Sequence, residues 1–285
     1  QLELGDRELP PFDEYRIYKN IQEAVMREEK RKNRRIRMPL FFKWTVACAI
    51  VLLVIGVGYN FYQSHNEANL VYREVCAVRG EKLLVLLPDG SRVWLNADSK
   101  LTYPEQFAKY NRNVTLEGEA YFEIAENKKS PFQVLAENVK IQVTGTCFNV
   151  KAYASDKVIK TTLDEGSINI GHVQSRRPMQ QMLPGQTAVY EKRSNVIKIK
   201  TDRYHDDASS WKSNRLIFRN ASLKEVLTTL SRHFDIEITV KNEKIASFTY
   251  DFVCKGNDLN YVLEVMQSIT PVSFKKISEY TYTVE

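Results

Sequence analysis

The sequence predicts one membrane-spanning helix followed by an all-β domain and a small α+β domain. Three observations lead to this fold class: an apolar run long enough to cross a bilayer, a succession of short alternating segments after it, and two amphipathic helical patterns near the C-terminus. The predicted parts are a helical stub at 1–40, the spanning helix at 41–62, a linker at 63–72, the all-β domain at 73–200, a hinge at 201–214 and the α+β domain at 215–285.

The stub is predicted to form an amphipathic helix. It has no Gly or Pro between residues 12 and 37, and its apolar side chains recur at helical spacing, at Tyr15, Tyr18, Ile21 (or Gln22) and Val25. A lone helix of this length is marginal in water, so we expect the stripe to pack on a cytoplasmic partner or on further helices upstream. A plain spacer is the alternative. Because the chain begins with Gln1, we expect it to be a truncated or processed form of a longer protein.

The apolar run from Trp44 to Tyr62 has the length of a membrane span. Only Thr45 and Asn60 are clearly polar within it, and its 19 residues at about 1.5 Å each reach about 28 Å, close to the thickness of the hydrocarbon core. A cleaved signal peptide and a buried core helix are the alternatives. The late start of the run and its lack of a small-residue cleavage site argue against the former.

Charge on the two sides of the run predicts its orientation. Seven lysines and arginines but only two glutamates lie between Arg27 and Arg37, whereas residues 63–71 carry no lysine or arginine. Positive flanks stay in the cytoplasm, so we expect the N-terminus inside and the C-terminus outside. The formal net charge of +6 comes mostly from this cluster. The basic residues therefore indicate a lipid surface and not a nucleic-acid partner.

The region that follows the linker predicts strands and turns. The segment EKLLVLLPDGSRVWLN has two strands around the turn Pro88-Asp89-Gly90, and the stretch from Val114 to Ile124 alternates apolar and polar residues. Further alternating segments recur at intervals of about 10 residues, without a convincing helix, which is typical of an all-β sandwich or barrel.

The last 70 or so residues predict two β-α-β copies, with two helices packed on one small sheet. Ser222 and Glu225 form a capping box for a helix with apolar residues at Leu223, Val226, Leu227 and Leu230. Asp258 caps a second helix in the same register, with apolar residues at Leu259, Val262, Leu263 and Met266.

The cysteines leave the disulfide state open. Cys48 lies in the predicted span, so Cys76, Cys147 and Cys254 remain outside it. At most one disulfide can form among three cysteines, and reduced buried thiols are an equally good interpretation.

Two other sets of titratable residues could carry catalysis or bind a metal, but a purely structural role explains each of them better. Glu117, Glu119 and Glu123 share one face of a strand, with adjacent carboxylates about 7 Å apart, but a solvated sheet face explains them better than a glycosidase pair. The run His205-Asp206-Asp207 could ligate a metal, yet three adjacent loop residues seldom converge, so we expect a polar linker. No nucleophile elbow, P-loop or dinucleotide motif is present. We predict no metal, no cofactor and no turnover enzyme.

One dipeptide, Gly145-Thr146, could carry a self-cleavage reaction. A hydroxyl held against the preceding carbonyl can move the acyl group from nitrogen to oxygen, leaving an ester that water cleaves. The alternative is that Gly145 marks a bulge where no side chain fits and Thr146 resumes the strand.

Several segments together resemble the FecR family of membrane-bound anti-sigma regulators. The segments are LPDGSRVWLNADSKLTYPEQF, VTLEGEAYFEIAENKKSPFQV, VTGTCFNVKAY, TTLDEGSINI and LPGQTAVY. The segment SSWKSNRLIFRNASLKEVLTTLSRHFDIEI resembles the C-terminal domain of Bacteroidetes-type members, which is similar to the secretin and TonB short N-terminal fold. The resemblance covers the chain from Val71 to Glu285.

The resemblance implies a function. It implies a single-pass inner-membrane protein with a cytoplasmic N-terminus and a periplasmic C-terminus. Its cytoplasmic helices would hold an ECF-type sigma factor, and its periplasmic part would receive a signal from the signalling domain of an outer-membrane TonB-dependent transporter, with periplasmic and inner-membrane proteases as further partners. Some members cleave themselves at a Gly-Thr bond, and Gly145-Thr146 is at the matching position. The stub at 1–40 is shorter than the family's sigma-binding region, so we expect part of that region to be missing.

Two other classes of function compete with this one. A membrane-anchored periplasmic scaffold, which would use the C-terminal fold for assembly, predicts self-association. An enzyme predicts a pocket with converging titratable groups.

Overall fold

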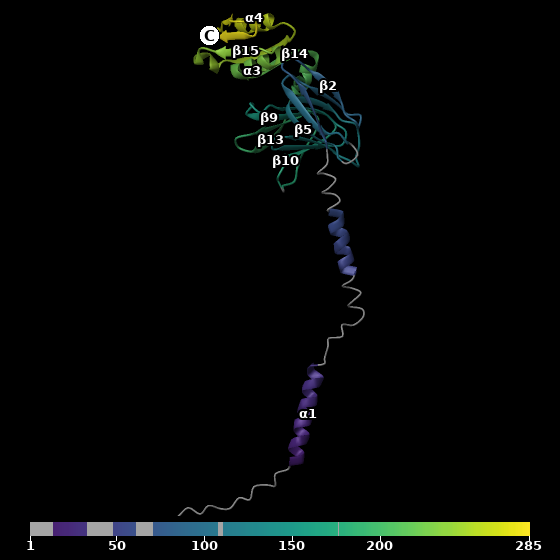
Figure 1. Cartoon of the computed structure of the whole chain (residues 1–285). Coiled ribbons are helices and arrows are strands. Elements are labelled where there is room, and N and C mark those ends of the chain that lie inside the picture. Colours follow the sequence, from purple (N-terminus) through teal and green to yellow (C-terminus); the bar gives the residue numbers. More distant parts are fainter. Residues whose placement is uncertain (1–13, 33–47, 61–70, 108–110, 176) are drawn as a thin grey trace, which may run out of the picture. The chain divides into compact units, whose positions relative to one another are not determined.

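The computed structural model describes residues 14–32, 48–60, 71–107, 111–175 and 177–285 (Figure 1). The chain divides into two compact units, Gln1–Asn69 and Leu70–Glu285. The first unit contains the helix α1 (Glu14–Lys32) and a helical segment at 48–60. The amphipathic helix predicted in the stub is therefore present.

The predicted span at 41–62 falls only partly on the described residues. Residues 48–60 of it are helical, and residues 41–47 and 61–62 lie outside the part of the chain that the structure describes. Among the described residues, none of the helices combines the length and the apolar character needed to cross a membrane.

The second unit begins with a β domain, as the alternating segments predict. Between residues 72 and 201 the described chain forms strands and turns without a helix. The strands are β1 (Tyr72–Ala77), β2 (Leu83–Leu86), β3 (Arg92–Leu95), β4 (Ser99–Pro104), β5 (Asn113–Glu123), β6 (Phe132–Ala136), β7 (Val139–Val143), β8 (Cys147–Ala152), β9 (Val158–Glu165), β10 (Ile168–His172), β11 (Gln180–Met182), β12 (Gln186–Glu191) and β13 (Val196–Thr201).

The long strand β5 organises this domain because it belongs to two sheet halves. Its first half pairs with β4 and β6, and its second half pairs with β3 and β8. The crossing point is Gly118, with φ of +103°. A Cβ there would lie 2.3 Å from Oγ of Ser99, so only glycine fits where the strand changes partners.

The core lies between the two halves. Phe122 stacks on Phe148 at 4.9 Å between ring centroids and meets Phe132 edge-on at 6.2 Å. All three rings are fully buried, and each contributes about 1.5–3 kcal/mol of transfer free energy. Because Phe132 comes from β6 and Phe148 from β8, Phe122 joins the two halves of the sandwich.

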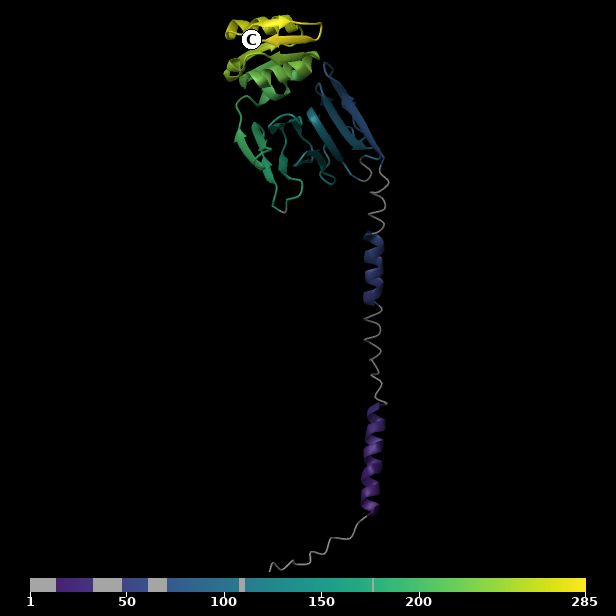
Figure 2. The same cartoon turned by 60° about the vertical axis from the view of Figure 1, so that its left-hand side comes forward.

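The C-terminal domain has the two predicted β-α-β copies (Figure 2). Its elements are β14 (Arg215–Ser222), α3 (Leu223–Phe234), β15 (Glu237–Val240), the 3-10 helix η2 (Glu243–Ser247), β16 (Thr249–Lys255), α4 (Leu259–Ile269), β17 (Phe274–Lys276) and β18 (Thr281–Val284). The predicted capping box is present, since the hydroxyl of Ser222 accepts from the backbone N–H of Glu225 and the Glu225 carboxylate accepts from that of Ser222. Asp258 caps α4.

The arrangement of the strands differs from the single small sheet that the sequence predicts. β14 pairs with β16 in one sheet, while β18 pairs with β15 and β17 in another. The apolar faces of both helices are buried among these strands. The alternation of apolar and polar residues predicts which side chains face the core, but it does not predict which strands pair. Two short sheets can bury the same side chains as one sheet, so the sequence does not distinguish them.

The segment at 201–214, predicted as a hinge without apolar periodicity, contains the 3-10 helix η1 (His205–Ser213). It buries Trp211. A single anchoring side chain leaves no periodic pattern, so the sequence gives no sign of this packing.

Candidate functional site

The dipeptide Gly145-Thr146 lies in the bend between β7 and β8. A Cβ on Gly145 would come within 3.0 Å of Glu126, so the backbone passes too close for a side chain. Across the bend, a Cβ on Gly166 would lie 2.7 Å from the Gly145 carbonyl oxygen. Neighbouring backbone therefore lies too close to Gly145 for a side chain, as expected if this glycine marks a bulge.

The Thr146 hydroxyl is buried and has a single partner among the described residues. Its Oγ1 donates to the carbonyl oxygen of Ser167 at 3.0 Å. The Thr146 carbonyl accepts from the N–H of Ile124, which ties the bend to β5. The nucleophile expected from the sequence is thus held in place, with a backbone carbonyl as its hydrogen-bond acceptor. The self-cleavage assignment stays a prediction.

The carboxylates on β5 do not form one solvated face, contrary to the sequence interpretation. Glu117 is exposed, but Glu119 is buried. The Glu119 carboxylate accepts from the side-chain amides of Asn96 at 2.9 Å and Asn149 at 3.0 Å. Glu119 is buried because η1 packs over this part of the sheet and covers the outward face of β5.

The helix η1 inserts two side chains into this outer face. The Trp211 indole N–H donates to Oδ1 of Asn149 at 3.1 Å. Nζ of Lys212 lies 3.3 Å from the ring centre of Tyr121 and 4.9 Å from that of Trp94. Burial lowers the pKa of Lys212 and raises the pKa of Tyr121, whose hydroxyl donates to Asp164 at 2.9 Å.

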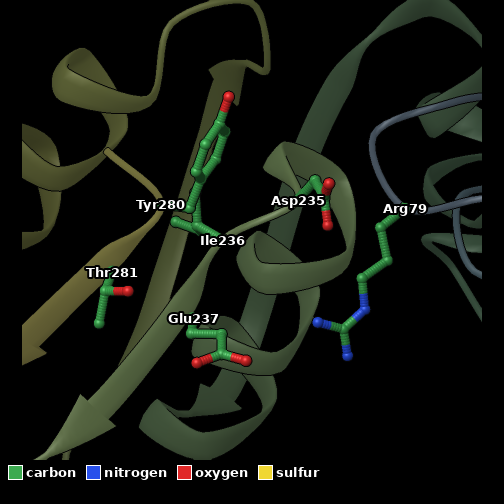
Figure 3. Close-up of a pocket in the computed structure, with 6 residues that line it drawn as sticks. All are labelled: Arg79, Asp235, Ile236, Glu237, Tyr280 and Thr281. Atoms are coloured by element: carbon green, nitrogen blue, oxygen red, sulfur yellow. The ribbon is translucent and has the colours of Figure 1, made fainter. Parts of the chain in front are cut away.

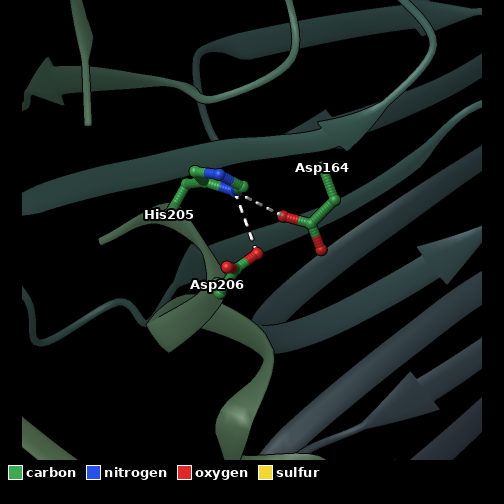
Figure 4. Close-up of side chains that lie close together, drawn as sticks. All are labelled: Asp164, His205 and Asp206. Carbon is green, nitrogen blue, oxygen red and sulfur yellow. Dashed lines mark ion pairs between the residues drawn. The ribbon is translucent and has the colours of Figure 1, made fainter. Parts of the chain in front are cut away.

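The start of η1 brings three metal-type ligands together (Figure 4). His205 Nδ1 lies 3.2 Å from Oδ1 of Asp206 and 3.6 Å from Oδ1 of Asp164. Burial raises the pKa of Asp164, although the hydrogen bond from Tyr121 and the nearby imidazole of His205 oppose the shift. Asp207 turns away and pairs with Arg219 at 3.1 Å.

The sequence interpretation of this segment is therefore corrected in part. Two of the three adjacent residues do converge, and the third member of the cluster comes from strand β9. Asp164 precedes His205 by 41 positions, and no spacing rule connects them. Only the packing of η1 against β9 could reveal the cluster.

A polar junction joins the β domain to the C-terminal domain. The guanidinium of Arg232, on α3, donates to Ser155 at 2.7 Å and to Asp156 at 2.9 Å, and lies 3.5 Å from the ring centre of Tyr153. The N–H of Gly80 donates to the carbonyl oxygen of Arg232 at 2.8 Å. Nζ of Lys82 donates to the carbonyl oxygen of Trp211, also at 2.8 Å.

An open pocket of about 300 Å³ lies beside this junction (Figure 3). Arg79 extends over it from the β domain, and Asp235, Glu237 and Tyr280 line it from the C-terminal domain. Arg79 pairs weakly with Asp98 at 3.8 Å. The mixed charges and open form of this pocket give it the character of a domain border, without converging catalytic groups.

The thiols and the N-terminal helix complete the candidate residues. Cys48, Cys76, Cys147 and Cys254 form no disulfide bond.

The apolar stripe on α1 faces solvent, with exposed fractions between 52% and 82% at Tyr15, Tyr18, Ile21 and Val25. An apolar face of this size on a single helix is typical of a surface that binds a partner.

Comparison with known proteins assigns both folded domains. The model of the FecR protein family matches residues 74–169, and the model of the FecR C-terminal domain matches residues 215–284. Two crystal structures of a candidate anti-sigma factor from Parabacteroides distasonis ATCC 8503, at 1.65 and 2.50 Å, are similar to the chain, with TM-scores of 0.68 and 0.69. Each is 26% identical, and each alignment covers 75% of this chain and 98% of the other. No curated protein matches the chain.

Proposed function

This chain belongs to the FecR family of sigma regulators, and from that premise we propose that it relays a signal from an outer-membrane TonB-dependent transporter to a cytoplasmic ECF-type sigma factor. The folded unit receives the signal in the periplasm, and the α1 region acts on the sigma factor in the cytoplasm. The observation that carries the proposal is the presence, in one chain, of both family domains, an apolar segment and an amphipathic helix beside a basic cluster.

The proposal places residues 41–62 across the inner membrane, with the basic side in the cytoplasm. Its support is the length of the apolar run and the charge difference between its flanks. A phosphatase that folds only outside the cytoplasm should be active when it is fused after Glu285, and inactive when it is fused before α1. The reverse pattern would contradict the orientation.

The cytoplasmic output depends on the apolar stripe of α1. The stripe is exposed, whereas the opposite side of the helix carries polar groups such as the pair Arg27 and Glu23. A helix with this division can bind by placing its apolar face in a groove of a partner. The sigma factor is the partner that the family membership supports.

A charge placed on the stripe tests this step. Val25→Asp should weaken binding of the co-expressed sigma factor by about tenfold or more, because an unpaired carboxylate is costly to bury in an apolar interface. The matched control is Asn20→Asp, which introduces the same charge on the polar side of α1. A pull-down through the whole chain measures both. Equal binding by wild type and Val25→Asp would refute the assignment of α1.

The periplasmic input requires a surface that a transporter domain can recognise. Strand β2 pairs only with β3 among the described strands, so its other edge offers unpaired backbone groups. Leu84 and Leu86 on this strand are 52% and 68% exposed. An exposed edge strand with apolar side chains is a template for strand addition from a partner. We assign the transporter contact to this edge.

The test uses the signalling domain of the transporter encoded beside this gene. Leu86→Lys should abolish its binding to the whole chain, because a lysine on an edge strand opposes the addition of a further strand. Val196→Lys is the matched control, since Val196 is an exposed apolar residue on a different edge strand, β13. Self-association of the chain without transporter binding would instead favour the scaffold function.

Self-cleavage between Gly145 and Thr146 is a further part of the proposal. Thr146 Oγ1 would attack the Gly145 carbonyl carbon, the C–N bond would break as the Thr146 nitrogen gains a proton, and water would hydrolyse the ester. Two fragments that meet at this bond should appear for wild type and disappear for Thr146→Val. A chain that stays intact by mass spectrometry would refute this step.

A further inference from the structure

The cluster of Asp164, His205 and Asp206 has the composition of a metal site. It offers one imidazole nitrogen and two carboxylate oxygens, all within 4.8 Å of one another. We propose that these three side chains bind a Zn²⁺ ion that joins strand β9 to the start of η1. This ion is independent of the proposed signalling role, which requires no metal.

The two distances from the imidazole nitrogen to the carboxylate oxygens agree with tetrahedral coordination. A tetrahedral zinc ion with bonds of about 2.0–2.2 Å to nitrogen and oxygen places its ligand atoms about 3.3–3.6 Å apart. His205 Nδ1 lies 3.2 Å from Asp206 Oδ1 and 3.6 Å from Asp164 Oδ1. The side chains thus need only small movements to coordinate an ion, and Figure 4 shows all three facing one point.

Two of the three ligand atoms have no other partner. Nδ1 of His205 and Oδ1 of Asp164 are both buried from solvent, and neither forms a hydrogen bond within the described part of the chain. Buried polar atoms without partners are rare in proteins because their desolvation is not compensated. A cation between them would satisfy both atoms at once. Each side chain as a whole is less than a third exposed, so neither can turn fully into solvent.

The surroundings orient one ligand and leave a path for the ion. The Tyr121 hydroxyl donates to the other carboxylate oxygen of Asp164, which fixes the direction of Oδ1. Such a hydrogen bond to a ligand is a regular feature of protein metal sites. Asp206 is 89% exposed, so its side chain can move aside to admit the ion and then close on it.

The donor set selects among metals. An imidazole with two carboxylates suits Zn²⁺ and similar transition metals, whereas Ca²⁺ takes six to eight oxygen ligands and Mg²⁺ prefers an octahedron of oxygens. Three protein ligands leave a fourth position for water. The bound ion would hold η1 against the β domain at the point where the chain passes to the C-terminal domain.

Zinc titration of the whole 285-residue chain in detergent micelles tests the proposal. Isothermal calorimetry should give one zinc ion per chain, and Co²⁺ in its place should give the visible absorption of a tetrahedral site. Asp164→Asn, His205→Gln and Asp206→Asn should each lower the affinity by about 100-fold or more, and Tyr121→Phe by about 10–100-fold. Asp206→Asn alters an exposed side chain, so its effect cannot be attributed to misfolding.

Two controls separate this site from other zinc ligands. Asp207→Asn changes the neighbouring carboxylate, which pairs with Arg219, and should leave zinc binding unchanged. Cys147→Ser removes the thiol that lies on the strand next to β9 and should also leave it unchanged. The proposal is overturned if wild type binds no zinc, if the ligand variants bind as wild type does, or if Cys147→Ser abolishes binding.

Discussion

At the scale of single residues, a buried ion pair fixes the first hairpin of the β domain. The guanidinium of Arg112 donates to Oδ2 of Asp89 at 2.8 Å, and the two side chains are only 2% and 6% exposed. Arg112 also donates to the carbonyls of Ser130 and Ala125. The Asp89 carboxylate in turn accepts from Ser91. One arginine therefore connects the segment before β5 to two other loops, the β2–β3 turn and the β5–β6 loop.

Removal of this arginine should be strongly destabilising. Arg112→Met leaves the Asp89 carboxylate buried without its counterion, which costs about 3–5 kcal/mol of unfolding free energy. Urea denaturation followed by circular dichroism measures the change. Lys128→Met is the control, because the pair of Lys128 with Glu126 is 81% and 69% exposed and should contribute little. A midpoint for Arg112→Met equal to that of wild type would contradict the expectation.

At the scale of elements, helix α3 is held at both ends. Ser222 caps its first turn, and His233 in its last turn contacts the Gly256 carbonyl with Nε2 at 2.6 Å. A carbonyl oxygen only accepts, so Nε2 carries the proton and donates. Burial lowers the pKa of His233, although the hydrogen bond to Gly256 opposes the shift.

This lowered pKa predicts acid sensitivity. The unfolded chain binds a proton at His233 with a pKa of about 6.5, whereas the folded chain binds it only at lower pH. The unfolded state therefore holds more protons below about pH 6.5, and stability falls as the pH falls through this range. His233→Gln should give a smaller loss of melting temperature between about pH 7.5 and pH 5.5 than wild type does. Identical losses would contradict the assignment.

At the scale of the folded unit, the junction between its two domains depends on few contacts. Arg232 supplies several of them, through Ser155, Asp156 and the ring of Tyr153. Trp211 and Lys82 add further contacts from η1 and the β2 region. The interface is polar, so a single substitution can remove the energetic coupling that makes the two domains unfold together.

Loss of Arg232 should uncouple the two domains. Arg232→Leu removes the ion pair with Asp156 and the contact with Tyr153, so the C-terminal domain should unfold separately from the β domain. Differential scanning calorimetry should then show two transitions where wild type shows one. Lys224→Leu, on the exposed side of the same helix, should keep one transition. A single transition for both variants would contradict a role of Arg232 in coupling.

Local patterns were enough to predict most elements of the fold. The turn at Pro88-Asp89-Gly90, the capping box at Ser222 and the alternation along the first half of β5 each depend on residues that are close in the chain, and each is present in the structure. Period, capping and turn chemistry are local properties, so the sequence by itself determined the β domain and the two C-terminal helices.

Only the tertiary structure decided the contacts that join distant segments. The pairing of strands into two C-terminal sheets, the burial of Glu119 under η1 and the meeting of Asp164 with His205 all join residues from distant segments. The free energy that selects such contacts comes from the packing of whole elements against one another, and no local pattern in the chain contains it.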